Sequence, residues 1–423
     1  MPARAARPQT AADLPTYERT VLDNGVRVVT ERIPSVRSVS VGVWVNAGSR
    51  DERPEEAGIT HFIEHMVFKG TSTRRGHHIN RRMESVGGHL NAFTAKESTC
   101  YYARALDEHL ARALDVVLDL ALRPTFPEKE LEKEKDVVVE EMKMYEDQPE
   151  DHVYDHYEAA IYAGGPLGHP VIGYEETVRG FTRQMLRDYV ERMYRPDRLV
   201  VAIAGNVTHK RAVDLVRRLT AAVERPEGTV DRVAPEPYTP AEIRIERPIQ
   251  QAHLVLGTRC WGLQDDRRTV LSLLNTVLGG GMSSRLNQRI RERYGFAYSV
   301  YSFVNLLQEV GDIGVYVGTD PEKVKRCEGL VRRELLALAE KPVSAQMLAG
   351  AKAQLKGSMM LGLESMSNRM MRLGKVELAF ETHFTMDEVL REVESVTAED
   401  VRAAAEVLFV PDELTSVALV PSN

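Results

Sequence analysis

A stretch without any hydrophobic pattern divides this chain of 423 residues into two halves. Residues 224–242 read ERPEGTVDRVAPEPYTPAE, in which proline and charged residues dominate and apolar residues follow neither a helical nor a strand period. This composition is typical of a linker on the protein surface. Domains commonly contain about 100–200 residues, so each half is long enough to fold around its own core. We therefore place an N-terminal domain at 1–228, a linker at 229–243 and a C-terminal domain at 244–423.

The order of predicted elements restarts after this linker. The first half opens with two strand-like runs around Asn24-Gly25, a hairpin signal, and closes with the apolar strand at 198–207. The second half opens with a strand at 251–260 and closes with a similar strand at 414–422. Helical patterns lie between the strands of both halves. The sequence thus predicts an α+β protein made of two related domains, each a mixed, mainly antiparallel sheet with helices packed on it.

The segment 53–70, RPEEAGITHFIEHMVFKG, has the pattern of one amphipathic helix. Pro54 suits its first position and Lys69-Gly70 its end. One face collects only apolar side chains, namely Ile59, Phe62, Ile63, Met66 and Val67. The other face carries His61, Glu64 and His65. Histidines four positions apart can bind one zinc ion, and the glutamate beside them can take a proton from an activated water. A chance HxxEH on a solvated face is the alternative, so this interpretation needs a third ligand.

Residues 127–145, PEKELEKEKDVVVEEMKMY, form a second predicted helix that offers such a ligand. Glu134 and Glu141 lie seven positions apart and therefore share a face, at the border of the apolar stripe. Carboxylates in that position need a partner, and a divalent cation is a suitable one. Ordinary pairing with the lysines of the same helix is the alternative. The HFIEH string earlier in the chain favours the metal.

HFIEH followed by VVVEEM resembles the inverted-zincin peptidases of the pitrilysin and insulinase class, and in particular the bacterial branch of the mitochondrial processing peptidase type. Matched by position, the resemblance implies that His61, His65 and Glu141 bind zinc, that Glu64 is the catalytic base, and that Glu134 supports the site. The second half has TVLSLLNTVLG where the first has GITHFIEHMVF, so we expect one zinc ion per chain.

The same resemblance implies a substrate site. GGHLNAFTAKEST, residues 87–99, matches the edge strand on which the family holds an extended peptide, so the backbone near Asn91, Ala92 and Phe93 should pair with substrate. Arg291 and Tyr298 match the pair that positions substrate from the second domain. The alternatives are a turn-capping Asn91, an arginine on a solvated helix and a tyrosine in an ordinary strand.

Two acidic residues, Asp151 and Asp155, resemble those that select basic side chains in the mitochondrial enzyme, and they predict a preference for arginine or lysine near the cleaved bond. A helix N-terminus that attracts acidic residues is the alternative. Asp155 also belongs to a second histidine string, His152 and His156 in DHVYDHYEA. Aspartate is shorter than glutamate and no third carboxylate follows at a matching distance, so a second metal site is disfavoured.

The function expected from these motifs is a zinc-dependent endopeptidase that hydrolyses extended, unfolded peptides by means of a metal-activated water. The alternative is a non-catalytic or partner-dependent subunit of a processing-peptidase-type complex. The complete motif set on one chain favours the enzyme, and it favours a homodimer whose domains enclose a clam-shell chamber. That last step follows from the resemblance alone.

Composition argues against several classes of protein. A net charge of -7 gives no reason to expect nucleic acid as a partner. No apolar run approaches the roughly 18 residues that span a bilayer, so no membrane contact is expected. The first residues, MPARAARPQTAADLP, contain no apolar core of a secretory signal, and the three cysteines are too dispersed for a disulfide framework. We therefore expect a cytoplasmic protein.

Overall fold

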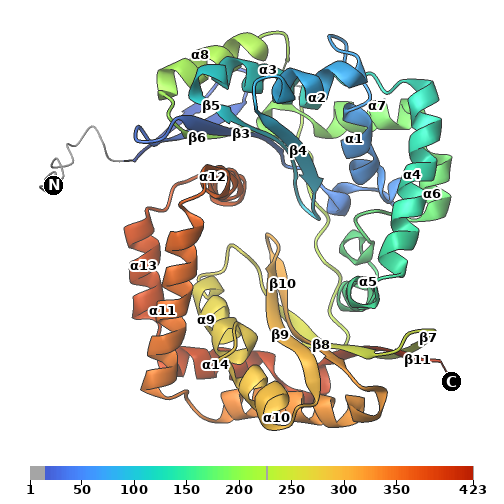
Figure 1. Ribbon diagram of the computed structural model, residues 1–423, viewed down its shortest axis with the longest axis vertical. Coiled ribbons are helices and arrows are strands. Elements are labelled where there is room, and N and C mark those ends of the chain that lie inside the picture. The colour runs from blue at the N-terminus through green and yellow to red at the C-terminus, as the bar shows by residue number, and fades with distance from the viewer. Residues whose placement is uncertain (1–14, 225–226, 423) are drawn as a thin grey trace, which may run out of the picture.

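The computed structural model describes residues 15–224 and 227–422 (Figure 1). The prediction that the first residues form no secretory signal concerns a segment outside the described part. Two separate sheets are present, with strand orders β1-β2-β6-β3-β5-β4 and β7-β11-β8-β10-β9. Each sheet is covered by helices, and the predicted α+β class with two related units is confirmed. Within the described residues no helix is both long and apolar enough to cross a membrane.

The N-terminal sheet is antiparallel except where β2 and β6 run parallel. Its strands are β1 (Thr16–Val21), β2 (Arg27–Arg32), β3 (Ser38–Val45), β4 (His89–Thr94), β5 (Thr99–Leu106) and β6 (Leu199–Gly205). Among the described residues, β4 is the last strand of the order and pairs only with β5, on one side. One long edge of β4 is therefore free for an added strand.

The C-terminal sheet repeats this arrangement. Its strands are β7 (Glu242–Arg247), β8 (Ala252–Trp261), β9 (Ala297–Leu306), β10 (Val310–Thr319) and β11 (Thr415–Pro421). In the first half the closing strand β6 runs parallel to β2 and antiparallel to β3. In the second half the closing strand β11 runs parallel to β7 and antiparallel to β8. The shared connectivity explains why the order of predicted elements restarts after the linker.

Each half has one main hydrophobic core between its sheet and its outer helices. The helices of the first half are α1 (Ile59–Val67), α2 (Gly76–Glu84), α3 (Leu110–Leu122), α4 (Glu128–Glu146), α5 (Pro149–Ile161), α6 (Glu175–Gly180), α7 (Arg183–Met193) and α8 (His209–Leu219). Those of the second half are α9 (Arg268–Gly279), α10 (Val324–Glu340), α11 (Ala345–Gly362), α12 (Met366–Phe380), α13 (Met386–Ser395) and α14 (Ala398–Leu408).

The two halves exchange helices. α12 of the second half lies on the N-terminal sheet, where Met370 and Leu373 pack with Trp44 in one cluster (Figure 1). A Cβ at Gly374 would overlap the Trp44 ring, so glycine permits this close approach. In return α5 of the first half packs on the C-terminal sheet through Val153, Tyr157 and their neighbours. Each sheet thus has an inner face covered by a helix from the opposite half, which fixes how the halves face each other.

Candidate metal centre

The helix that carries HFIEH is shorter than its sequence pattern predicts. Pro54 begins a separate 3-10 turn (Pro54–Glu56), and α1 starts only after Gly58, whose φ of +91° breaks the helical path. A side chain at Gly58 would also meet the carbonyl oxygen of Ile172 at 2.5 Å. Along α1 the five predicted apolar residues are fully buried, while His61, Glu64 and His65 are only partly buried and face a cavity.

A buried carboxyl group anchors the start of α1. Glu52 is 7% exposed, and its two oxygens accept hydrogen bonds from the backbone N–H groups of Gly58 at 2.7 Å and Thr60 at 2.8 Å. These N–H groups have no partner within the helix, so Glu52 satisfies them and fixes the direction in which α1 leaves the loop. This role of Glu52 could not be predicted from the sequence, because its distance from the helix start matches no capping pattern.

His61, His65 and Glu141 come together as predicted for a ligand set. Nε2 of His65 lies 3.4 Å and Nε2 of His61 lies 3.9 Å from Oε2 of Glu141. All three ligand atoms lie within 4.8 Å of one another, and in the described residues no other group of histidine, cysteine or acidic side chains meets this criterion. Donors about 2.0–2.2 Å from one tetrahedral ion are separated by roughly 3.3 Å, so these residues fit a zinc ion after small movements.

The two histidines differ in charge. Burial, followed by repulsion from His65, lowers the pKa of His61 to about 4, so its imidazole is neutral at pH 7. Burial also acts to lower the pKa of His65, but hydrogen bonds to Glu134 and Glu141 outweigh it and raise that pKa to about 9. Without a metal, His65 is therefore protonated between two carboxylates, and a binding ion must displace that proton.

Glu134 orients His65 from behind. Its Oε1 accepts the Nδ1 hydrogen of His65 at 3.0 Å, and its Oε2 lies 2.6 Å from Nζ of Lys69. Burial acts to raise the pKa of Glu134, but these two contacts outweigh it and hold the pKa below its usual value. The fixed Nδ1–H leaves Nε2 of His65 as the ligand atom. The sequence pattern did not indicate Lys69 for this role.

Glu64, the predicted base, lies beside the candidate ligands in the same cavity. Its Oε2 accepts a hydrogen bond from Thr94 at 2.7 Å, and burial raises its pKa above the usual value for glutamate. A carboxylate of raised pKa takes up a proton more readily at neutral pH. Thr94 ends strand β4, so the edge strand and the base are directly connected. Thr94 was not among the predicted site residues, although it directly follows Phe93.

One cavity of about 530 Å³ joins the metal centre to the predicted substrate site. Ala92 and Phe93 of β4 line it together with Asp151 and Asp155 of α5. Asn91 lies outside the lining, and its side-chain oxygen accepts the backbone N–H of Ala92 at 2.9 Å. The side chain of Asn91 thus occupies the backbone N–H of Ala92, which belongs to the strand predicted to pair with substrate.

Three carboxylates from α5 give this cavity an acidic wall. Asp151, Asp155 and Glu158 line it, and Glu158 pairs with Nζ of Lys96 at 2.8 Å. Burial, with a smaller contribution from Glu158, raises the pKa of Asp155 to about 6. At pH 7 this wall therefore carries negative charge directly beside the candidate metal ligands.

Arg291 and Tyr298 lie together in the second half but not in this cavity. The guanidinium carbon of Arg291 lies 5.5 Å from the centre of the Tyr298 ring, and Tyr298 is 83% exposed. Within the described residues no hydrogen bond or ion pair connects either residue to the metal centre. Their predicted contact with substrate stays a prediction.

The second histidine string forms no metal group. Nε2 of His152 lies 2.8 Å from Nε2 of His156 and 2.9 Å from Nη2 of Arg247. Burial, followed by Arg247, lowers the pKa of His152. Its neighbour Asp155 instead faces the cavity of the metal centre. The three cysteines are free and buried.

Comparison with known proteins agrees with this geometry. Residues 27–175 match the family model "Insulinase (Peptidase family M16)", and residues 180–355 match "Peptidase M16 inactive domain". The zinc protease YmxG of Bacillus subtilis is 43% identical over 93% of this chain and 96% of its own length. The zinc protease Rv2782c of Mycobacterium tuberculosis is 43% identical over 96% of this chain and 93% of its own length.

Solved structures show the same fold. A protease from Helicobacter pylori superposes with a TM-score of 0.90 at 21% identity, covering 96% of this chain and 100% of that one. A structure from Pseudomonas fluorescens, described as a peptidase M16 inactive domain, gives the same TM-score and identity and covers 96% and 98% of the two chains.

Proposed function

Because this chain belongs to peptidase family M16, we propose that it is a zinc-dependent endopeptidase that hydrolyses extended, unfolded peptides. The observation that carries the proposal is the convergence of His61, His65 and Glu141 with Glu64 in a cavity that the free edge strand β4 borders. One zinc ion per chain is proposed, because only the first half offers this group among the described residues.

The reaction assigns a task to each residue. His61, His65 and Glu141 would hold a zinc ion, which would supply a Lewis acid to polarise the scissile carbonyl and to lower the pKa of the attacking water. Glu64 takes the proton of that water and passes it to the leaving amine. Glu134 keeps the Nδ1 proton on His65, so that Nε2 faces the metal. Thr94 holds the carboxylate of Glu64 through one oxygen and leaves the other for the proton.

The substrate is proposed to bind as an added strand on β4. Backbone hydrogen bonds along Asn91, Ala92 and Phe93 would hold a peptide of almost any sequence, provided that it is unfolded. The carboxamide of Asn91 must first release the N–H of Ala92. Arg291 and Tyr298 are proposed to contact the peptide from the second half.

A preference for basic side chains is part of the proposal. Asp151 and Asp155 line the same cavity as the metal ligands, where they would attract an arginine or lysine next to the cleaved bond. Charge reversal at both positions should abolish the preference. An unchanged cleavage pattern in the doubly reversed variant would remove this part of the proposal.

The proposed working form is a homodimer that needs no other subunit. Its support is that one chain carries the candidate ligands, the base and the arginine–tyrosine pair together. The alternative, a non-catalytic or partner-dependent subunit, predicts that the purified chain binds zinc without cleaving peptides. Sedimentation of the active fraction measures the oligomeric state.

The decisive experiment incubates the purified chain alone with an unstructured basic peptide and compares three variants. Glu64→Gln should keep one zinc ion and lose cleavage, whereas Glu141→Gln should lose the zinc as well. Glu140→Gln is the matched control, because Glu140 is exposed and pairs only with Lys143 on the same helix. Cleavage by Glu64→Gln at the wild-type rate would refute the assignment of the base. Zinc binding without cleavage by wild type would favour the alternative function.

A further inference from the structure

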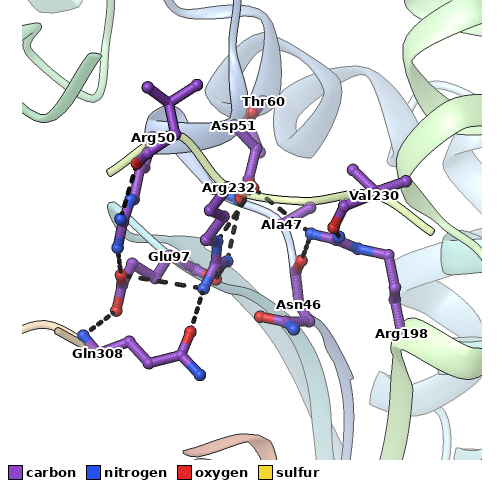
Figure 2. A network of polar contacts seen from close by, with 12 residues as sticks. Asn46, Ala47, Arg50, Asp51, Thr60, Glu97, Arg198, Val230, Arg232 and Gln308 are labelled. Atoms are coloured by element: carbon purple, nitrogen blue, oxygen red, sulfur yellow. Dashed lines mark hydrogen bonds and ion pairs between the residues drawn. The ribbon is translucent and has the colours of Figure 1, made fainter. Parts of the chain in front are cut away.

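The linker between the halves is bound to the protein rather than merely exposed. Arg198 donates from Nη1 to the carbonyl oxygen of Val230 at 3.1 Å, and Arg50 donates from Nη2 to that of Val233 at 3.0 Å (Figure 2). Both arginines belong to the first half and have side chains that are at most 9% exposed. The composition of the linker predicted only a surface segment, and most of its residues are partly or fully exposed.

Arg232 is the exception within the linker, because its side chain is 9% exposed. Its guanidinium binds both oxygens of Asp51, each at 3.0 Å. It also donates at 2.6 Å to the carbonyl oxygen of Glu97, in the turn between β4 and β5, and at 3.1 Å to the side-chain oxygen of Gln308, in the β9–β10 hairpin (Figure 2). One side chain therefore joins three segments, two from the first half and one from the second.

Glu97 completes the connection between the halves. Its Oε2 accepts the backbone N–H of Gln308 at 2.8 Å, and its Oε1 pairs with Arg50. Arg50 in turn lies 2.5 Å from a carboxylate oxygen of Glu309 in the same hairpin. The hairpin of the second half is thus held against the β4–β5 turn by a charged network in which Arg50 is buried and Glu309 is half exposed.

The segments that this network joins are adjacent in the sequence to residues that support the candidate metal centre. The β4–β5 turn follows Thr94, which bonds Glu64, and Asp51 immediately precedes Glu52, which anchors α1. A second cavity of about 440 Å³ lies against Arg232, and Glu158 lines both this cavity and that of the metal centre. The network therefore borders a cavity that adjoins the cavity of the candidate metal centre.

We propose that Arg232 is a positioning residue, which holds the β9–β10 hairpin of the second half against the end of the substrate-binding strand β4. Its effect on catalysis rests on the proposed peptidase function, whereas its mechanical effect does not. The role requires arginine, because a planar guanidinium can bind Asp51 with two parallel hydrogen bonds and still reach Glu97 and Gln308. A lysine keeps the charge but cannot satisfy these acceptors together.

Hydrogen exchange and kinetics test the proposal on the full-length chain, with Arg232→Lys compared with wild type. Backbone amides of residues 95–98 and 307–309 should exchange about tenfold faster in the variant, while those of α8 keep the wild-type rate. On an unstructured peptide, KM should rise at least fivefold while kcat stays within twofold and the zinc content stays at one per chain. Asp231→Asn is the control, because Asp231 is the exposed neighbour and bonds only Thr229 within the linker.

Each result decides a separate point. Wild-type exchange rates in Arg232→Lys would refute the mechanical connection, and faster exchange with unchanged KM would refute the positioning role. If wild type itself cleaves no peptide, the proposed function fails, but the exchange rates still decide the connection. If Arg232→Lys does not fold, Gln308→Ala takes its place, since it removes one acceptor from the second half and leaves the buried charges paired. The increase in amide exchange rate and the increase in KM are then expected to be about a third as large.

Discussion

Replacing Glu52 with glutamine should stabilise the N-terminal half at pH 7 and leave its stability nearly unchanged at pH 5. Burial raises the pKa of Glu52 to about 8, and the hydrogen bonds from Thr60 and Gly58 offset only part of that effect. A carboxyl with a raised pKa binds its proton more tightly in the folded chain. Its contribution to stability is therefore complete below the unfolded pKa and is lost as the pH rises towards the folded value.

The size of the effect follows from the two pKa values. Between pH 5 and pH 7 the carboxyl of Glu52 is mostly ionised in the unfolded chain and stays mostly protonated in the folded chain. At about 1.36 kcal/mol per pKa unit, wild type loses about 2.5 kcal/mol over this interval. Glu52→Gln has no proton to lose. Its amide gives up one backbone hydrogen bond, worth about 1 kcal/mol, at both pH values. At pH 5 the carboxyl of the unfolded wild type is already mostly ionised, which costs wild type about 0.8 kcal/mol and nearly offsets that loss, so the variant gains stability only at pH 7.

The measurement uses urea unfolding followed by the fluorescence of Trp44, which is fully buried in the first half. The chain has 2 tryptophans, so a Trp261→Phe background leaves Trp44 as the only one. A chelator removes metal, because zinc binding has its own pH dependence. An equal loss of stability in Glu52→Gln at pH 5 and pH 7 would contradict the reasoning. It would mean that Glu52 is ionised in the folded chain, held so by its two backbone hydrogen bonds.

Three further predictions concern the site. Glu134→Gln should weaken zinc binding about 10–100-fold in a competition titration, because the neutral amide has a single acceptor oxygen for His65 and Lys69 together, and an unchanged affinity would contradict that role. The preference for basic peptides should fall as the pH drops from 7 to 5, since the raised pKa of about 6 makes Asp155 neutral there. Asp155→Asn should show no such fall in the kcat/KM ratio of basic to neutral peptides. Gly58→Ala should lower the thermal midpoint by about 4–8 °C, because a left-handed φ and overlap with the Ile172 carbonyl cost about 2 kcal/mol. A midpoint within a degree of wild type would contradict this.

Local patterns predicted the elements of this chain well and its partners poorly. The helical repeat identified which side chains of α1 are buried, because that repeat depends only on backbone geometry. It placed the helix start at Pro54 instead of after Gly58, since proline suits the first position of a 3-10 turn equally well. Periodicity also shows that one face of α5 is buried, but it does not show that the burying surface belongs to the opposite half.

The interactions that sequence reasoning missed all join segments that are distant or irregular. Glu52 anchors α1 through a loop, Thr94 reaches Glu64 from a neighbouring strand, and Arg232 lies in a segment whose composition indicates only a linker. None of these contacts follows a helical or strand repeat. Their common signal is a charged or polar residue whose local segment offers it no partner, which indicates a distant partner without identifying it.

The contrast between the two histidine strings shows what a motif needs beyond its spacing. HFIEH and HVYDH both place two histidines four positions apart on a helix, yet among the described residues only the first forms a possible metal group with a carboxylate from another helix. Oε2 of Glu141 lies 3.4 Å from Nε2 of His65, and the negative charge of Glu141 favours a metal cation between the two side chains. Nη2 of Arg247 lies 2.9 Å from Nε2 of His152, and the positive charge of Arg247 repels a metal cation. Because α5 is the helix that crosses to the C-terminal sheet, its histidines meet the side chains of β7, whereas α1 stays beside α4 in its own half. The exchange of helices between the halves therefore determines which of the two strings can hold a metal.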